Sequence, residues 1–207
     1  MNEMDVLSGY LTDMARDRII CKQQLLKRYG QEADYSIKQS INKNLVKKFR
    51  YKSMRGKSIV CYHLDDYGRA YVSSYGGIPY SEVAYTVGFR THIWHTLMVG
   101  ETRYNLAKQG YDLISDYQNT VQKYITAVPG EQADLYVLEK YKPIVAIEVD
   151  RGYKRCRIKP KIEKWKETGL AIWWFTSGSE QYRKIEKYNL RIDKLCSLEE
   201  LGWNPCL

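Results

Sequence analysis

The sequence predicts a chain of mixed α and β class, in which a small N-terminal domain is followed by an α/β domain. Three observations predict this class. Positive charge is concentrated between Arg16 and Lys57, the helical pattern in that block gives way to two alternating strands, and the later elements run helix, three strands, helix, strand, helix, strand. We expect the first domain to span residues 1–75, a linker near 73–82, and the second domain to span 83–207.

The charge of the chain is unevenly distributed. The net charge is +9, yet the segment from Arg16 to Lys57 holds 13 Lys and Arg against three acids, a local charge of +10, so the remainder sums to −1. A basic block joined to a nearly neutral remainder favours a nucleic-acid-binding module attached to a domain with another task. The alternative is a solvated basic face that has no partner.

Composition also indicates the compartment. No run of about 18 apolar residues exists, and the N-terminal residues lack the apolar core of a signal peptide. The cysteines are odd in number, scattered and without a CxxC pair, which favours free thiols in a reducing cytoplasm over disulfides or a zinc site. We therefore expect a cytoplasmic protein without a membrane span.

The basic block has a recognisable order of elements. Apolar spacing predicts a helix over residues 3–16, a second helix over 22–29 that ends at Gly30, and a third helix that begins at Asp34 and runs to about Lys48. The next residues, FRYKSMRGKSIVCYHL, read as strand, turn and strand.

Three helices followed by a basic-tipped hairpin is the plan of a winged helix-turn-helix. In that plan the third helix enters the major groove of double-stranded DNA, and the wing touches backbone phosphates. A protein–protein module is the alternative, and the charge density favours DNA. The expected DNA-binding residues on the helix and at the wing are Lys38, Gln39, Asn42, Lys43, Lys47, Lys52, Arg55 and Lys57.

The second domain begins with a predicted helix over about 83–109 and contains two apolar runs that carry acids at their ends. Asp134 opens the run LYVLE, and Glu148 and Asp150 close the run PIVAIEV. Folded as a hairpin about residues 140–143, the runs would bring three carboxylates together, and clustered carboxylates at a strand end are suited to Mg²⁺. The remaining expected elements are a strand over 111–118, a helix over 157–168 with Pro160 in its first turn, a strand over 170–178, a helix over 179–189 and a final strand or turn.

This order of elements, with acids at strand ends, resembles the PD-(D/E)xK nuclease fold, the restriction-endonuclease-like fold. More closely, the chain resembles the replication-relaxation family of plasmid and mobile-element proteins over about residues 5–190. The resemblance is carried by the wing with its exit YHLDDYGRAYV, the segment FRTHIWHTLMVGE, the Ala133-Asp134 pair, and EVDRG (148–152) followed by Lys161. It implies a winged helix joined to a nuclease-like domain that acts on DNA in replication, transfer or its regulation.

Two departures from the nuclease pattern bear on activity. Ala133 precedes Asp134 where the pattern has Pro, and Asp150 stands where it has Lys. Lys161 can supply the missing lysine, with Lys159 and Lys154 as other candidates. The expected catalytic residues are Asp134, Glu148, Asp150 and Lys161. Asp134, Glu148 and Asp150 are also the expected ligands of Mg²⁺, and Glu101 on the preceding helix could join them.

Two functions remain open from the sequence. The first is a metal-dependent DNA endonuclease or nickase. The second is a non-catalytic regulator or accessory factor, in which Lys154, Arg155, Arg157 and Lys161 neutralise the carboxylates through salt bridges. In either case the expected partner is double-stranded DNA, with a homodimer or a replication or transfer complex as further partners.

Overall fold

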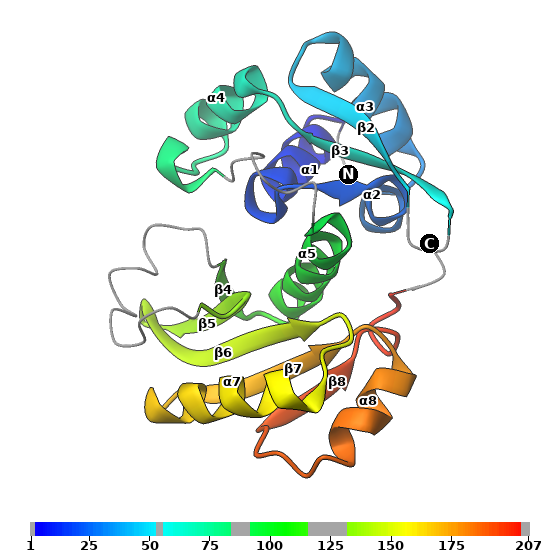
Figure 1. Ribbon diagram of the computed structural model, residues 1–207. Coiled ribbons are helices and arrows are strands. Elements are labelled where there is room, and N and C mark those ends of the chain that lie inside the picture. Colours follow the sequence, from blue (N-terminus) through cyan, green and yellow to red (C-terminus); the bar gives the residue numbers. More distant parts are fainter. Residues whose placement is uncertain (1–2, 53–55, 84–91, 116–131, 204–207) are drawn as a thin grey trace. The chain divides into compact units, whose positions relative to one another are not determined.

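The structure is a computed structural model that describes residues 3–52, 56–83, 92–115 and 132–203 (Figure 1). Its described residues form a mixed α and β fold with seven α-helices and two sheets. The chain divides into two compact units between Gly100 and Glu101. Within the described part, no helix is long and apolar enough to cross a bilayer.

The first unit combines helices with a three-stranded antiparallel sheet of order β1-β3-β2. Strand β3 is therefore central, and β2 is an edge strand. The elements are α1 (Glu3–Asp17), β1 (Ile20–Cys21), α2 (Lys22–Tyr29), α3 (Glu32–Asn42), β2 (Val46–Lys52), β3 (Ser58–Leu64), α4 (Asp66–Tyr75) and a 3₁₀ turn (Tyr80–Glu82).

A single core holds the first unit together. Helix α1 contributes Tyr10, Leu11 and Met14, α3 contributes Ile37, and one face of β3 contributes Tyr62. All of these side chains are buried. Leu11, Met14 and Ile37 lie at positions of the predicted helical apolar spacing, whereas Tyr10 does not.

Helix α4 approaches the chain that precedes β2 very closely at Gly68. A Cβ placed on Gly68 would lie 2.0 Å from the carbonyl oxygen of Leu45, so only glycine fits there. The same carbonyl accepts a hydrogen bond from the amide of Asp65, at 2.9 Å. This contact fixes the start of α4 against the start of β2.

The third helix ends earlier than the sequence predicts. Helix α2 has the expected bounds, but α3 ends at Asn42 rather than near Lys48. Asn44 adopts a positive φ of 56°, and the amide of Leu45 turns back to the carbonyl of Ser40. The backbone then enters β2, so the prediction was wrong for Lys47 and Lys48, which lie on an edge strand.

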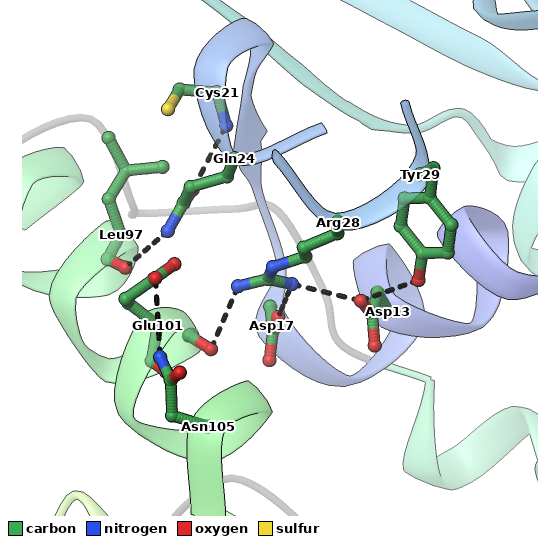
Figure 2. A network of polar contacts seen from close by, with 10 residues as sticks. Asp13, Asp17, Cys21, Gln24, Arg28, Tyr29, Leu97, Glu101 and Asn105 are labelled. Carbon is green, nitrogen blue, oxygen red and sulfur yellow. Dashed lines mark hydrogen bonds and ion pairs between the residues drawn. The ribbon is translucent and has the colours of Figure 1, made fainter. Parts of the chain in front are cut away.

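A buried arginine ties together helices of the first unit (Figure 2). Arg28 on α2 donates from Nη1 to Oδ2 of Asp13 and to Oδ2 of Asp17, each at 2.9 Å, and from Nη2 to the carbonyl oxygen of Gly100 at 3.0 Å. The Tyr29 hydroxyl adds a hydrogen bond of 2.7 Å to Asp13. Two helix α1 carboxylates and one backbone carbonyl thus neutralise and solvate a cation that is almost fully buried.

Gly100 belongs to α5 (Ile93–Lys108), and a second contact holds the same helix. Gln24 on α2 donates from Nε2 to the carbonyl oxygen of Leu97 at 2.9 Å, while its Oε1 accepts from the amide of Cys21 at 3.2 Å. Helix α5 continues past the division between the units, and its side chains Ile93, Leu97 and Leu106 are buried. The rest of the predicted 83–109 helix lies partly outside the described residues.

The second unit contains a five-stranded sheet of order β4-β5-β6-β7-β8. Strands β4, β5 and β6 pair antiparallel, whereas β6, β7 and β8 pair parallel through helical crossovers. The elements are β4 (Asp112–Ser115), β5 (Leu135–Glu139), β6 (Lys142–Asp150), α7 (Arg155–Glu167), β7 (Ala171–Thr176), α8 (Ser179–Glu186) and β8 (Lys194–Ser197).

The predicted elements of this unit are present with small shifts in their bounds. One expectation fails, because Pro160 is the sixth residue of α7 and not in its first turn. Helix α7 begins at Arg155, earlier than predicted, and proline at this position removes one intrahelical amide donor. The apolar side of α7 (Ile158, Ile162 and Trp165) nevertheless packs into the core of the sheet.

The segment predicted as a linker, residues 73–82, has regular structure and core contacts. Ser73 to Tyr75 complete α4, and Ile78 and Val83 are buried in the core of the first unit. The compact units divide further along the chain, inside α5. The expected domain bounds of 1–75 and 83–207 remain a prediction.

The buried Arg28 cluster makes a stability prediction. Replacing Arg28→Met leaves the Asp13 and Asp17 carboxylates without their cation, and breaking such a pair costs about 3–5 kcal/mol. Urea unfolding of the full chain should show this loss. Lys27→Met, an exposed lysine on the same helix, is the matched control and should change the unfolding free energy by less than about 1 kcal/mol. Equal stability of the two variants would contradict the role of Arg28.

Candidate functional site

The hairpin of β5 and β6 places the predicted acids of the two runs near each other. Lys140 and Tyr141 both have positive φ, 49° and 65°, which is the geometry of a two-residue type I′ turn. The register pairs Leu135 with Ile147, so Asp134 lies at the end of β5 beside Glu148 on β6. The predicted hairpin is therefore confirmed.

Glu148 is a buried carboxylate in contact with α7. Its Oε2 accepts a hydrogen bond from Lys161 Nζ at 2.5 Å, and its Oε1 accepts one from Trp165 Nε1 at 2.8 Å. Burial and, to a lesser extent, the charge of Asp134 together raise the pKa of Glu148 to about 8, although Lys161 and the Trp165 indole oppose the shift. Burial disfavours the charged form of Lys161, but the Glu148 carboxylate outweighs this effect and raises the pKa of Lys161.

Asp134 completes a group of three ionisable side chains. Its Oδ2 accepts a hydrogen bond from the amide of Val149 at 2.8 Å, which holds the carboxylate against β6. The charge of Asp134 acts on the pKa of both Glu148 and Lys161. The structure thus brings together Asp134, Glu148 and Lys161.

Asp150 has a different set of contacts. Its Oδ1 accepts from the amides of Gly152 and Tyr153, each at 2.6 Å. Its Oδ2 accepts from Trp174 Nε1 at 3.3 Å and from Gln181 Nε2 at 3.2 Å. Four donors therefore surround a fully buried carboxylate, which organises the connection between β6 and α7.

The three predicted metal ligands do not form one cluster. Across the described ranges, no group of three or more His, Cys, Asp and Glu side chains is placed to hold a metal ion. Asp134 and Glu148 are neighbours, and Asp150 is occupied by its own donors. Glu101, also buried, accepts from Asn105 Nδ2 at 3.2 Å.

Of the three candidate lysines, Lys161 is the one that contacts Glu148. Lys154 is the residue that precedes α7, and Lys159 is exposed on that helix. Trp165 and Gln181 were not predicted as site residues. Trp165 follows Lys161 by four residues and so shares its helix face, a signal that the sequence contained.

The predicted DNA-binding residues of α3 lie at different levels of exposure. Lys38 Nζ lies 3.0 Å from Asp34 Oδ2, although the Lys38 side chain is largely exposed. Gln39 is half-buried, whereas Asn42 and Lys43 are exposed where the helix ends. Asn42 and Lys43 therefore present exposed polar side chains at the C-terminal end of α3.

The predicted wing residues belong to the hairpin of β2 and β3. Lys47 Nζ forms an ion pair of 2.7 Å with Asp65 Oδ1. Lys52 and Lys57 are exposed, and Arg55 lies outside the described residues. The sequence-based set omitted two further exposed cations of the edge strand β2, namely Lys48 and Arg50.

Comparisons with known proteins assign no family. No protein-family model matches the chain, and no curated protein gives a significant match. The resemblance to the replication-relaxation family remains a prediction from the sequence. What the site can do is therefore inferred from its residues and contacts.

The raised pKa of Glu148 predicts how the unfolding free energy depends on pH. In the folded state Glu148 keeps its proton up to about pH 8, whereas in the unfolded chain it loses that proton near pH 4.5. The stability that this proton contributes is therefore complete below pH 4.5 and is lost as the pH rises through 8. Over this window the unfolding free energy should fall by roughly 2–4 kcal/mol more in the wild type than in Glu148→Gln. Urea unfolding at a series of pH values measures the difference.

Glu139→Gln, at an exposed acid on β5, is the control and should keep the wild-type pH profile. Parallel profiles for wild type and Glu148→Gln would show that Glu148 is ionised throughout.

Proposed function

We propose that the first unit binds double-stranded DNA as a winged helix-turn-helix. The observation that carries the proposal is the set of exposed cations at the end of α3, along the edge strand β2 and immediately before β3. These cations are Lys43, Lys48, Arg50, Lys52 and Lys57. Phosphate contacts from such residues supply affinity that weakens steeply with salt.

The local structure supports this assignment. Within the described residues, Lys43, Lys48, Arg50 and Lys52 take part in no ion pair, so their charges are available to an external anion. Lys38 and Lys47 instead have carboxylate partners, which reduces the charge they offer. Helix α3 follows α2 after a short turn and precedes an antiparallel hairpin, the order in which a recognition helix and a wing occur.

The resemblance in sequence suggests the setting of this activity. In our proposal the protein acts in the replication or transfer of a plasmid, phage or other mobile element, or in the regulation of these processes. DNA binding by the first unit is the part of the proposal that the described side chains support.

The first test removes charge from the proposed DNA-binding surface. The triple variant Lys43→Gln, Lys48→Gln, Lys52→Gln should bind a labelled DNA duplex about tenfold or more weakly, and the slope of log K against log salt should shrink by about 2.7. Fluorescence anisotropy between about 50 and 200 mM salt measures both quantities. The matched control, Arg183→Gln, Lys184→Gln, Lys187→Gln, removes the same charge from exposed positions at α8. An unchanged affinity in the first variant would exclude this surface.

A second candidate function, metal-dependent phosphodiester hydrolysis, is favoured by the juxtaposition of Asp134, Glu148 and Lys161. Two neighbouring carboxylates are a sufficient protein contribution for Mg²⁺, which is often held by one or two carboxylates together with substrate phosphate. Asp150 fits this role less well, because two protein donors bind each of its oxygens, whereas each oxygen of Glu148 accepts one hydrogen bond. When bound, Mg²⁺ would polarise the phosphodiester and lower the pKa of the attacking water.

The protein residues have distinct tasks in this proposal. Asp134, held by the Val149 amide, and Glu148 supply the oxygen ligands. Lys161 stabilises negative charge that develops on the phosphate, and Trp165 positions Glu148 through its indole N–H. The alternative is a non-catalytic regulator, in which the Lys161–Glu148 ion pair serves only to neutralise the buried carboxylate.

A cleavage assay separates these two functions. If the site is catalytic, Asp134→Asn, Glu148→Gln and Lys161→Met should each lower Mg²⁺-dependent nicking of supercoiled plasmid at least about a hundredfold, while duplex affinity stays within about twofold. Glu139→Gln is the control for loss of a nearby exposed acid. Wild-type protein that binds duplex DNA but never nicks it with Mg²⁺ or Mn²⁺ would support the regulator.

A further inference from the structure

We propose that the cationic segment formed by residues 151–159 is a second surface for duplex DNA, located on the second unit. This inference rests on the proposed function in that it takes double-stranded DNA as the partner. It goes beyond that function because the DNA affinity assigned above belongs to the first unit alone. The surface would hold the phosphate backbone next to Lys161.

The charge of the segment carries the inference. Its cations are Arg151, Lys154, Arg155, Arg157 and Lys159, all of them exposed, and no acid occurs between Asp150 and Glu163. In the part of the chain that the structure describes, Lys154, Arg157 and Lys159 form no ion pair. Five cations without an intervening acid repel one another, and a polyanion relieves that repulsion.

The cations at the N-terminal end of α7 also interact unfavourably with the dipole of that helix. Arg155 and Arg157 lie in the first turn, which contains no acid, and Lys154 caps the helix without a side-chain hydrogen bond. Cations at this end oppose the helix dipole, whereas a phosphate there is stabilised. The helix therefore retains a charge arrangement that favours an anionic partner.

The backbone of the segment is held in place before any partner binds. Asp150 accepts from the amides of Gly152 and Tyr153, and Gly152 has a φ of 119° that few other residues adopt. Gln181 on α8 donates to Asp150 Oδ2 and also to the carbonyl oxygen of Tyr153. Such preorganisation lowers the entropy lost on binding.

The spacing of the cations leads toward the candidate site. Lys154, Arg157 and Lys161 are separated by three and four residues, so they lie along one side of α7. Lys161 at the end of this row forms the ion pair with Glu148. A phosphate backbone bound along the row would therefore pass the Asp134, Glu148 and Lys161 group.

The test uses the full chain and a labelled duplex of random sequence. Lys154→Gln, Arg157→Gln should weaken binding about fivefold or more and reduce the salt slope by about 1.8, as expected for two lost phosphate contacts. The α8 variant Arg183→Gln, Lys187→Gln removes equal charge from exposed positions on either side of Glu186, and should keep the wild-type slope. Urea unfolding confirms that both variants are folded.

The outcomes distinguish this inference from the proposed function. If the α7 variant behaves like the α8 control while the first-unit variant loses affinity, the second surface is excluded and the proposed function stands. If the α7 variant loses affinity and the first-unit variant does not, the second surface stands and the first-unit assignment fails. If the wild type binds no duplex DNA, both fail.

Discussion

The arrangement of the second unit depends on one buried carboxylate. Glu148 lies on β6, the central strand of the five-stranded sheet, and is 1 % exposed. Removing a carboxylate from water costs several kcal/mol unless a cation and hydrogen bonds replace the lost hydration. Lys161 and Trp165 do so from one side of α7, and this requirement fixes which face of α7 meets the sheet. The same face contributes Ile158 and Ile162 to the core, so apolar and polar contacts specify one orientation.

Glu148 and Asp150 show how residues two apart on one strand can serve different purposes. Both point to the same side of the sheet, and both are buried. Glu148 meets a flexible lysine and remains next to Asp134, whereas Asp150 meets four donors that hold the following turn. One acid is therefore available for chemistry that depends on charge, and the other is a structural element of the loop. Asp150 holds the backbone of the segment 151–159 in its conformation, and helix α7 places that segment close to Lys161.

Periodicity and turn residues were sufficient to predict most elements, because apolar spacing reports directly which face is buried. Helix α2, the β5–β6 hairpin and α8 illustrate this. The end of α3 was missed because Asn44 in a left-handed conformation stops the helix, although residues on both sides keep a helical spacing of apolar groups. Hydrogen bonds between distant residues were not predictable. Arg28 with Asp13, Asp17 and Gly100 depends on how three helices pack, and the four donors to Asp150 come from four different positions. Sequence spacing could suggest that Asp134, Glu148 and Lys161 meet, but not that Asp150 is engaged elsewhere.

The position of β2 at the edge of its sheet has a consequence for solubility. One side of an edge strand presents backbone donors and acceptors that can pair with a strand of another molecule, and lysines on such a strand oppose this pairing. Strand β2 carries Lys47, Lys48, Arg50 and Lys52, so mutual repulsion keeps the edges of two molecules apart. The cations that we propose bind DNA would thus also oppose aggregation through this edge. A polyanion that neutralised them would have to cover the edge itself or leave it open to strand addition.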